Sequence, residues 1–171
     1  MSIQEKAEGV AQIVADAGGR VVGRTRLQKL TYLLSAAGLE DRFSFVYKHY
    51  GPFSEELSQS TRAAELLGLL TEQEQAAQWG GTYSTYSAAV QAAANVPDAR
   101  LQIAHIAIEA DAIELELAAT AVFLAREGVE DPWSETARRK PEKAEGGRLK
   151  RAKALYRQIL NVQTPEALPV I

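Results

Sequence analysis

Apolar side chains recur at helical spacing in the first third of the chain. Between residues 2 and 17 they return every three or four positions, with Ser2 as an N-cap and two glycines directly after, which predicts a first helix. A short β-like run at residues 20–23 separates it from a leucine stripe that predicts a second helix from about Thr25 to Ala37. The stripe consists of Leu27, Leu30, Leu33 and Leu34.

The pattern changes to period two over residues 43–50, where aromatic and polar side chains alternate as in a short strand. We expect Gly51-Pro52 to break this strand and Ser54 to cap a third helix that ends at Gly68. A polar turn and a β-rich segment at residues 82–87 follow, which predicts a β-hairpin. A helix followed by a hairpin in this order is typical of the third helix and the wing of a winged-helix domain.

Another helical pattern starts after Pro97 and continues to Leu124. About thirty residues is long for one globular helix, so either it is kinked near Asp111 or it is a long helix that packs within the chain or joins two copies as a homodimer. Pro141 is well placed in the first turn of a final helix that ends near Leu160. The last residues, 163–171, are expected to form a loose tail.

These patterns predict a mainly α fold, a helical domain with a small β-hairpin. Residues 1–95 would form a winged-helix-like core, residues 96–162 a C-terminal helical extension packed on it as one compact unit, and residues 163–171 the tail.

Composition narrows the chemistry of this 171-residue chain. It has no cysteine and only two histidines, His49 and His105, which lie in different predicted elements, so we expect no disulfide, no thiol catalysis and no metal site. No nucleophile triad or phosphate-binding loop is present, which favours a protein without enzymatic activity and without a cofactor. An enzyme using Lys29, His49 and Tyr50 would need a pocket that the sequence does not reveal.

Hydrophobic segments are too short for a membrane. The longest, residues 115–125, is interrupted by Glu116, and the N-terminus lacks an apolar signal region. The sequence therefore predicts a soluble, cytoplasmic protein.

Charge is distributed unevenly along the chain, although the net charge is only -3. Residues 138–157 carry nine Lys and Arg against two Glu, whereas residues 1–137 are acidic. This basic segment could neutralise nucleic-acid phosphates or fold back onto the acidic helices of the same chain. The third helix has three glutamates and a single Arg62, a poor surface for DNA. A DNA-binding alternative would therefore use the hairpin at residues 80–86 and take its phosphate contacts from Arg24, Arg26, Lys48 or the basic segment. The contacts of the basic segment would be Arg148, Lys150, Arg151 and Lys153.

A polar patch at the start of the second helix is the main binding candidate, because basic residues are disfavoured near a helix N-terminus unless an anion or carboxylate is close. The alternative is a solvated face opposite the leucine stripe. The segment before Gly51-Pro52 adds polar and aromatic residues. The predicted partner-binding residues are Arg24, Arg26, Gln28, Lys29, Tyr32, Lys48, His49, Tyr50 and Ser54.

Four strings along the chain resemble a known family. They are Arg24-Thr25-Arg26-Leu27-Gln28-Lys29-Leu30-Thr31-Tyr32-Leu33-Leu34, Tyr47-Lys48-His49-Tyr50-Gly51-Pro52-Phe53-Ser54 with Leu57, and residues 116–120 and 139–144. Together they are similar to the Panacea antitoxin-domain superfamily, near its YwgA-like branch. The resemblance implies a mainly helical protein of bacterial or phage type that acts as an antitoxin or adaptor by binding a protein partner, such as a toxin or a protease substrate. It implies no catalytic residue.

Overall fold

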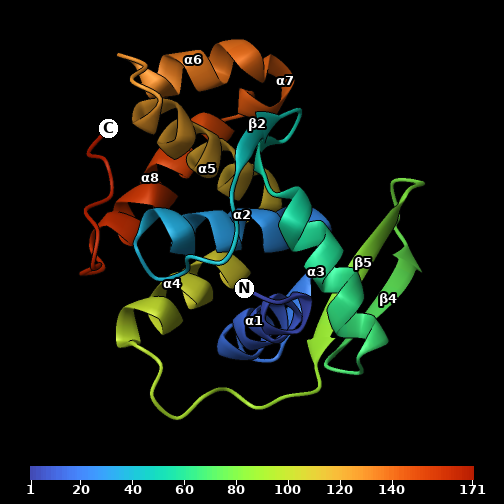
Figure 1. The fold of residues 1–171 in the computed structure, drawn as a ribbon. Helices are drawn as coiled ribbons and strands as arrows, with labels where there is room; N and C mark the ends of the chain where they lie inside the picture. Colours follow the sequence, from blue (N-terminus) through green and yellow to red (C-terminus); the bar gives the residue numbers. More distant parts are fainter.

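The computed structural model describes residues 1–171, which form eight helices and five strands (Figure 1). The helices are α1 (Ile3–Asp16), α2 (Arg24–Ala36), α3 (Glu55–Leu66), α4 (Asp98–Glu109), α5 (Ala112–Arg126), α6 (Pro132–Arg139), α7 (Pro141–Ala144) and α8 (Arg148–Leu160). The strands are β1 (Arg20–Val22), β2 (Val46–Lys48), β3 (Gly51–Phe53), β4 (Leu70–Ala76) and β5 (Thr82–Ala88). Helices predominate, but the fold is mixed α/β rather than helical with a single hairpin.

Two small antiparallel sheets replace the one that the sequence predicts. β5 lies between β1 and β4, so that Tyr86 pairs with both Val21 and Glu72, while β2 and β3 form a separate hairpin. The strand expected at residues 43–50 does end before Gly51, at Lys48, but Gly51-Pro52 also begins a second strand, β3, which was not expected. Proline is tolerated there since the two-stranded hairpin has free outer edges.

Side-chain caps fix several helix starts. Ser2 is the predicted N-cap and also forms a capping box with Glu5, and the Ser54 hydroxyl accepts a hydrogen bond from the backbone N–H of Leu57. The alternative of one long helix after Pro97 is wrong. Ala110 is extended, and the Asp111 side chain accepts from the first backbone N–H groups of α5, so α4 and α5 are separate helices that both pack on α2.

The C-terminal residues also differ from expectation. The predicted final helix is divided into α7 and α8 by Gly146 and Gly147, which both have positive φ. The tail is not loose, because Leu168 is buried and the Tyr156 hydroxyl donates a hydrogen bond of 2.6 Å to the Pro169 carbonyl.

One hydrophobic cluster joins both halves of the chain, with α5 at its centre. α5 is buried on most sides and contacts α2, α6, α8 and β3. No helix is both long and apolar enough to cross a membrane.

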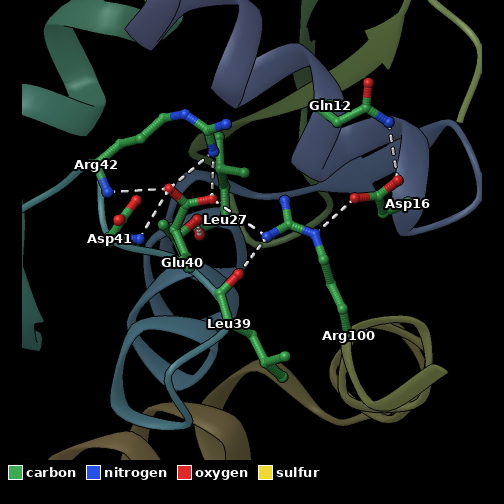
Figure 2. A network of polar contacts seen from close by, with 9 residues as sticks. Gln12, Asp16, Leu27, Leu39, Glu40, Asp41, Arg42 and Arg100 are labelled. Carbon is green, nitrogen blue, oxygen red and sulfur yellow. Dashed lines mark hydrogen bonds and ion pairs between the residues drawn. The ribbon is translucent and has the colours of Figure 1, made fainter. Parts of the chain in front are cut away.

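A buried ion network ties α1, α4 and the segment after α2 together (Figure 2). Arg100 lies 2.7 Å from Asp16 and 3.2 Å from Glu40, and its guanidinium also donates to the Leu39 carbonyl. Arg42 approaches the same Glu40 carboxylate at 2.9 Å. The two arginines thus balance two carboxylates that are almost without solvent contact.

Candidate functional site

Residues from three distant parts of the sequence meet at the β2–β3 hairpin. α2 contributes Lys29, α5 contributes Glu116 and Thr120, and the α6–α7 segment contributes Lys140 and Lys143. We call these five residues the hairpin cluster. They lie in three of the four strings named above, at residues 24–34, 116–120 and 139–144.

The hairpin turns at His49 and Tyr50 and closes at Gly51, whose φ of 84° favours glycine. A Cβ atom at residue 51 would also overlap the Thr120 hydroxyl. Gly51 therefore allows both the turn and the close approach of the hairpin to α5.

Two lysines hold the hairpin by its main chain. Lys29, fully buried, donates a hydrogen bond of 2.7 Å from Nζ to the Pro52 carbonyl. Lys140, which is also buried, donates one of 2.9 Å to the His49 carbonyl. Both sides of the turn are thus bonded to the body of the protein.

The buried carboxylate of Glu116 joins two of the three lysines. Its Oε2 lies 3.1 Å from Lys140 Nζ and 2.7 Å from Lys143 Nζ. Three ammonium groups thus lie at the hairpin, and the one carboxylate pairs directly with two of them. Burial lowers the pKa of Lys29 to about 7, with repulsion from Lys140 and Lys143 acting in the same direction and Glu116 opposing it.

Cations also lie against the aromatic rings of the hairpin. Lys143 Nζ is 4.6 Å from the centre of the Tyr50 ring, and the Arg139 guanidinium is 4.8 Å from that of Tyr47. Tyr47 packs on Phe123 of α5, whereas Tyr50 at the tip is 57% exposed. The hairpin thus exposes one aromatic side chain, Tyr50, to solvent, while its backbone is bonded to the body of the protein.

The nine predicted partner-binding residues do not form one surface. Gln28, Lys29, Tyr32 and Ser54 are buried. The Gln28 amide bonds both the N–H and the carbonyl of Ser54, and the Tyr32 ring packs on Phe45. Burial also raises the pKa of the Tyr32 hydroxyl. These four residues join the hairpin and α3 to α2 from inside.

The two arginines at the start of α2 have different surroundings. Arg26 donates to the carbonyls of Ala107, Ile108 and Ala110 and so caps the C-terminus of α4. Arg24 is exposed and pairs with β4 at 3.6 Å to Glu72 and 3.8 Å to Glu74, not with Glu55 or Glu56 of α3. The predicted residues that are clearly exposed are Arg24, Lys48, His49 and Tyr50.

A cleft of about 360 Å³ lies beside the hairpin tip, between the N-terminus of α2 and the tip of the β4–β5 hairpin. Tyr50, Val22 and Tyr83 line it together with Trp79, which is 75% exposed. The sequence analysis did not select Trp79. Its signal is a tryptophan next to Gly80-Gly81 in a polar turn, where core packing does not explain a large apolar residue.

The basic segment folds back in part onto the acidic body, as one of the two alternatives predicts. Besides the pairs with Glu116, Arg151 lies 3.1 Å from Glu114, and Arg148 donates to main-chain carbonyls of α7. Lys153 lies 6.0 Å from the Trp133 ring centre. Lys150 is exposed.

Comparisons with protein-family models, with curated proteins and with solved structures find no match for this chain.

Proposed function

We propose that this chain is a non-enzymatic protein-interaction module, antitoxin-like or adaptor-like, that binds its partner at the cleft beside the β2–β3 hairpin. One observation carries the proposal: two large aromatic side chains, Tyr50 and Trp79, are exposed at 57% and 75% and line the same cleft. Exposed apolar residues that gather in one place are typical of interaction sites.

The composition of the cleft fits a protein partner. Trp, Tyr and Arg are the residues that contribute most to binding energy at protein interfaces. Trp79, Tyr50 and Arg24 occur together here, with Val22 and Tyr83 as further apolar surface. Because the hairpin cluster fixes the hairpin backbone, little conformational entropy would be lost at Tyr50 on binding.

Lys29 is the one residue whose properties suggest catalysis, since lysines with a pKa near 7 act as nucleophiles or bases in enzymes. Its ammonium is buried and donates a hydrogen bond to the Pro52 carbonyl, and Lys29 does not line the cleft beside the hairpin. Its burial and this hydrogen bond support a structural role.

The test uses peptides selected from a random library on the immobilised wild-type protein, with affinities measured by calorimetry. Tyr50→Ala and Trp79→Ala should each weaken binding by about tenfold or more, with unchanged melting temperatures. Leu66→Ala is the matched control, because Leu66 is 89% exposed on α3 and lies outside the cleft. Equal affinity of the double variant and the wild type would disprove the cleft as the binding site.

A winged-helix DNA-binding regulator is the second candidate. The order α1, β1, α2, α3, β4, β5, which the β2–β3 hairpin interrupts after α2, supports it, as does the position of β5 between β1 and β4. The charges of α3 oppose it, with Glu55, Glu56 and Glu65 against Arg62. The contacts would come from Arg148, Lys150, Arg151 and Lys153. Duplex DNA binding that falls steeply with salt, and is lost when these four residues are neutralised, would favour this function.

A further inference from the structure

The tip of the hairpin contacts a segment about ninety residues further along the chain. We propose that Lys140 and Lys143 are positioning residues, which together with Glu116 hold the β2–β3 hairpin on α5 and set the orientation of Tyr50 for partner binding. This inference rests on the proposed function, since it assigns the residues that prepare the same site.

The hairpin needs such external contacts. Each strand has only three residues, and an isolated two-stranded hairpin is marginally stable at best. β2 contributes little to the core, because Val46 and Lys48 are exposed. The contacts of its tip with α5, α6 and α7 therefore decide where the tip lies.

Glu116 links the contacts at two adjacent tip residues. Its carboxylate pairs with Lys140, whose ammonium donates to the main-chain carbonyl of His49. The same carboxylate accepts hydrogen bonds from Lys143, whose ammonium lies over the ring of Tyr50. One buried side chain thus fixes the backbone at residue 49 and the aromatic ring at residue 50.

The charges favour a role in orientation over a role in stability. Lys29 faces the hairpin from α2, Lys140 from the α6–α7 junction and Lys143 from α7, against the one carboxylate of Glu116 on α5. Arg139 of α6 adds a further cation at Tyr47. A well-packed apolar cluster would often be at least as stable as such a buried ion group. The charged groups, unlike apolar ones, select one orientation of the hairpin through directional bonds.

The experiment measures amide hydrogen exchange of residues 46–53 in the free protein, by mass spectrometry, and affinity for a peptide selected on the wild type. Lys143→Gln should speed amide exchange in this segment by about tenfold and lower the affinity for the peptide by a similar factor, because a charge-assisted hydrogen bond is lost. Its melting temperature should stay close to that of Lys150→Gln, an exposed control on α8. Lys143→Arg, which keeps the charge, should restore both values.

Unchanged exchange of residues 46–53 in Lys143→Gln would overturn the inference. So would faster exchange with an unchanged peptide affinity. Lys140→Met provides a second variant that removes the bond to His49 and should affect the same segment. The exchange measurement needs no ligand. If Tyr50→Ala left peptide affinity unchanged, the proposed function would fail while the exchange data would still report on the contacts of the hairpin.

Discussion

The ammonium of Lys29 lies 2.7 Å from the carbonyl oxygen of Pro52, and this buried hydrogen bond connects the centre of α2 to β3. Proline has no backbone N–H, so the carbonyl is the only main-chain hydrogen-bonding group of residue 52. The bond therefore gives a hydrogen-bond partner both to the buried ammonium of Lys29 and to the hairpin backbone at residue 52.

Lys29 should make stability depend on pH. Its pKa is about 7 in the folded protein against an ordinary value of 10.5, so between these values the folded state binds fewer protons than the unfolded state. The free energy of unfolding should therefore rise with pH, by about 2 to 3 kcal/mol from this group between about pH 6 and about pH 9. Lys29→Met should remove this rise in urea unfolding curves.

Other groups titrate in the same pH range, so the pH dependence of stability is compared between the wild type and the variants. Lys150→Met, at an exposed position, should keep the wild-type pH dependence. A Lys29→Met protein with the wild-type slope would show that Lys29 keeps its ordinary pKa in the folded state.

Gly51→Ala should destabilise the protein by about 3 kcal/mol, since alanine at positive φ costs about 1 kcal/mol and its Cβ overlaps the Thr120 hydroxyl. Gly68→Ala is the matched control, because Gly68 has φ of 74° but open space around its Cβ position. It should lose only about 1 kcal/mol in denaturant unfolding.

The steric contribution at Gly51 can be isolated with Thr120→Ala, which removes the overlapping hydroxyl. The double variant should be more stable than the sum of the single effects predicts. Additive effects would mean that backbone strain alone accounts for the loss.

Arg100→Met should destabilise the fold by about 3 to 5 kcal/mol, because Asp16 and Glu40 would remain buried without their shared cation. The exposed pair of Arg24 with β4 offers a comparison, and Arg24→Met should change stability by less than about 1 kcal/mol. Chemical denaturation near neutral pH measures both. Equal effects would show that burial of the Arg100 network adds nothing.

Leu168→Ala should lower the free energy of unfolding by about 2 to 3 kcal/mol, because this side chain is buried. Such a loss would be unexpected for a loose tail. Val170, two residues away, is 90% exposed, so Val170→Ala should stay within about 0.5 kcal/mol of the wild type. Thermal unfolding of the two variants distinguishes a packed tail from an unpacked one. Two small effects would contradict the packed arrangement.

Local chemistry in the sequence was sufficient to predict most elements of the N-terminal half. Ser2 and Ser54 mark helix starts because their hydroxyls bond the next free N–H groups, a contact made within three residues. The break at Asp111 was visible only as one of two alternatives, since an N-cap and a helix-surface aspartate look the same in a continuous helical pattern.

These local patterns do not predict which polar residues are buried. Gln28, Lys29 and Ser54 were expected on a binding surface because they belong to a polar patch at the start of the second helix and to the polar segment around Gly51-Pro52. They are buried since each finds a hydrogen-bond partner on another element, and those partners are fixed by packing.

The sequence by itself thus determined the three N-terminal helices, the β4–β5 hairpin and the uneven charge, because periodicity, caps and turns act over a few residues. Only the tertiary structure decided that Lys140 and Glu116 meet at the β2–β3 hairpin and that Tyr50 and Trp79 share a cleft. These residues are far apart in sequence, and their proximity follows from how α5, α6 and α7 pack on the N-terminal half.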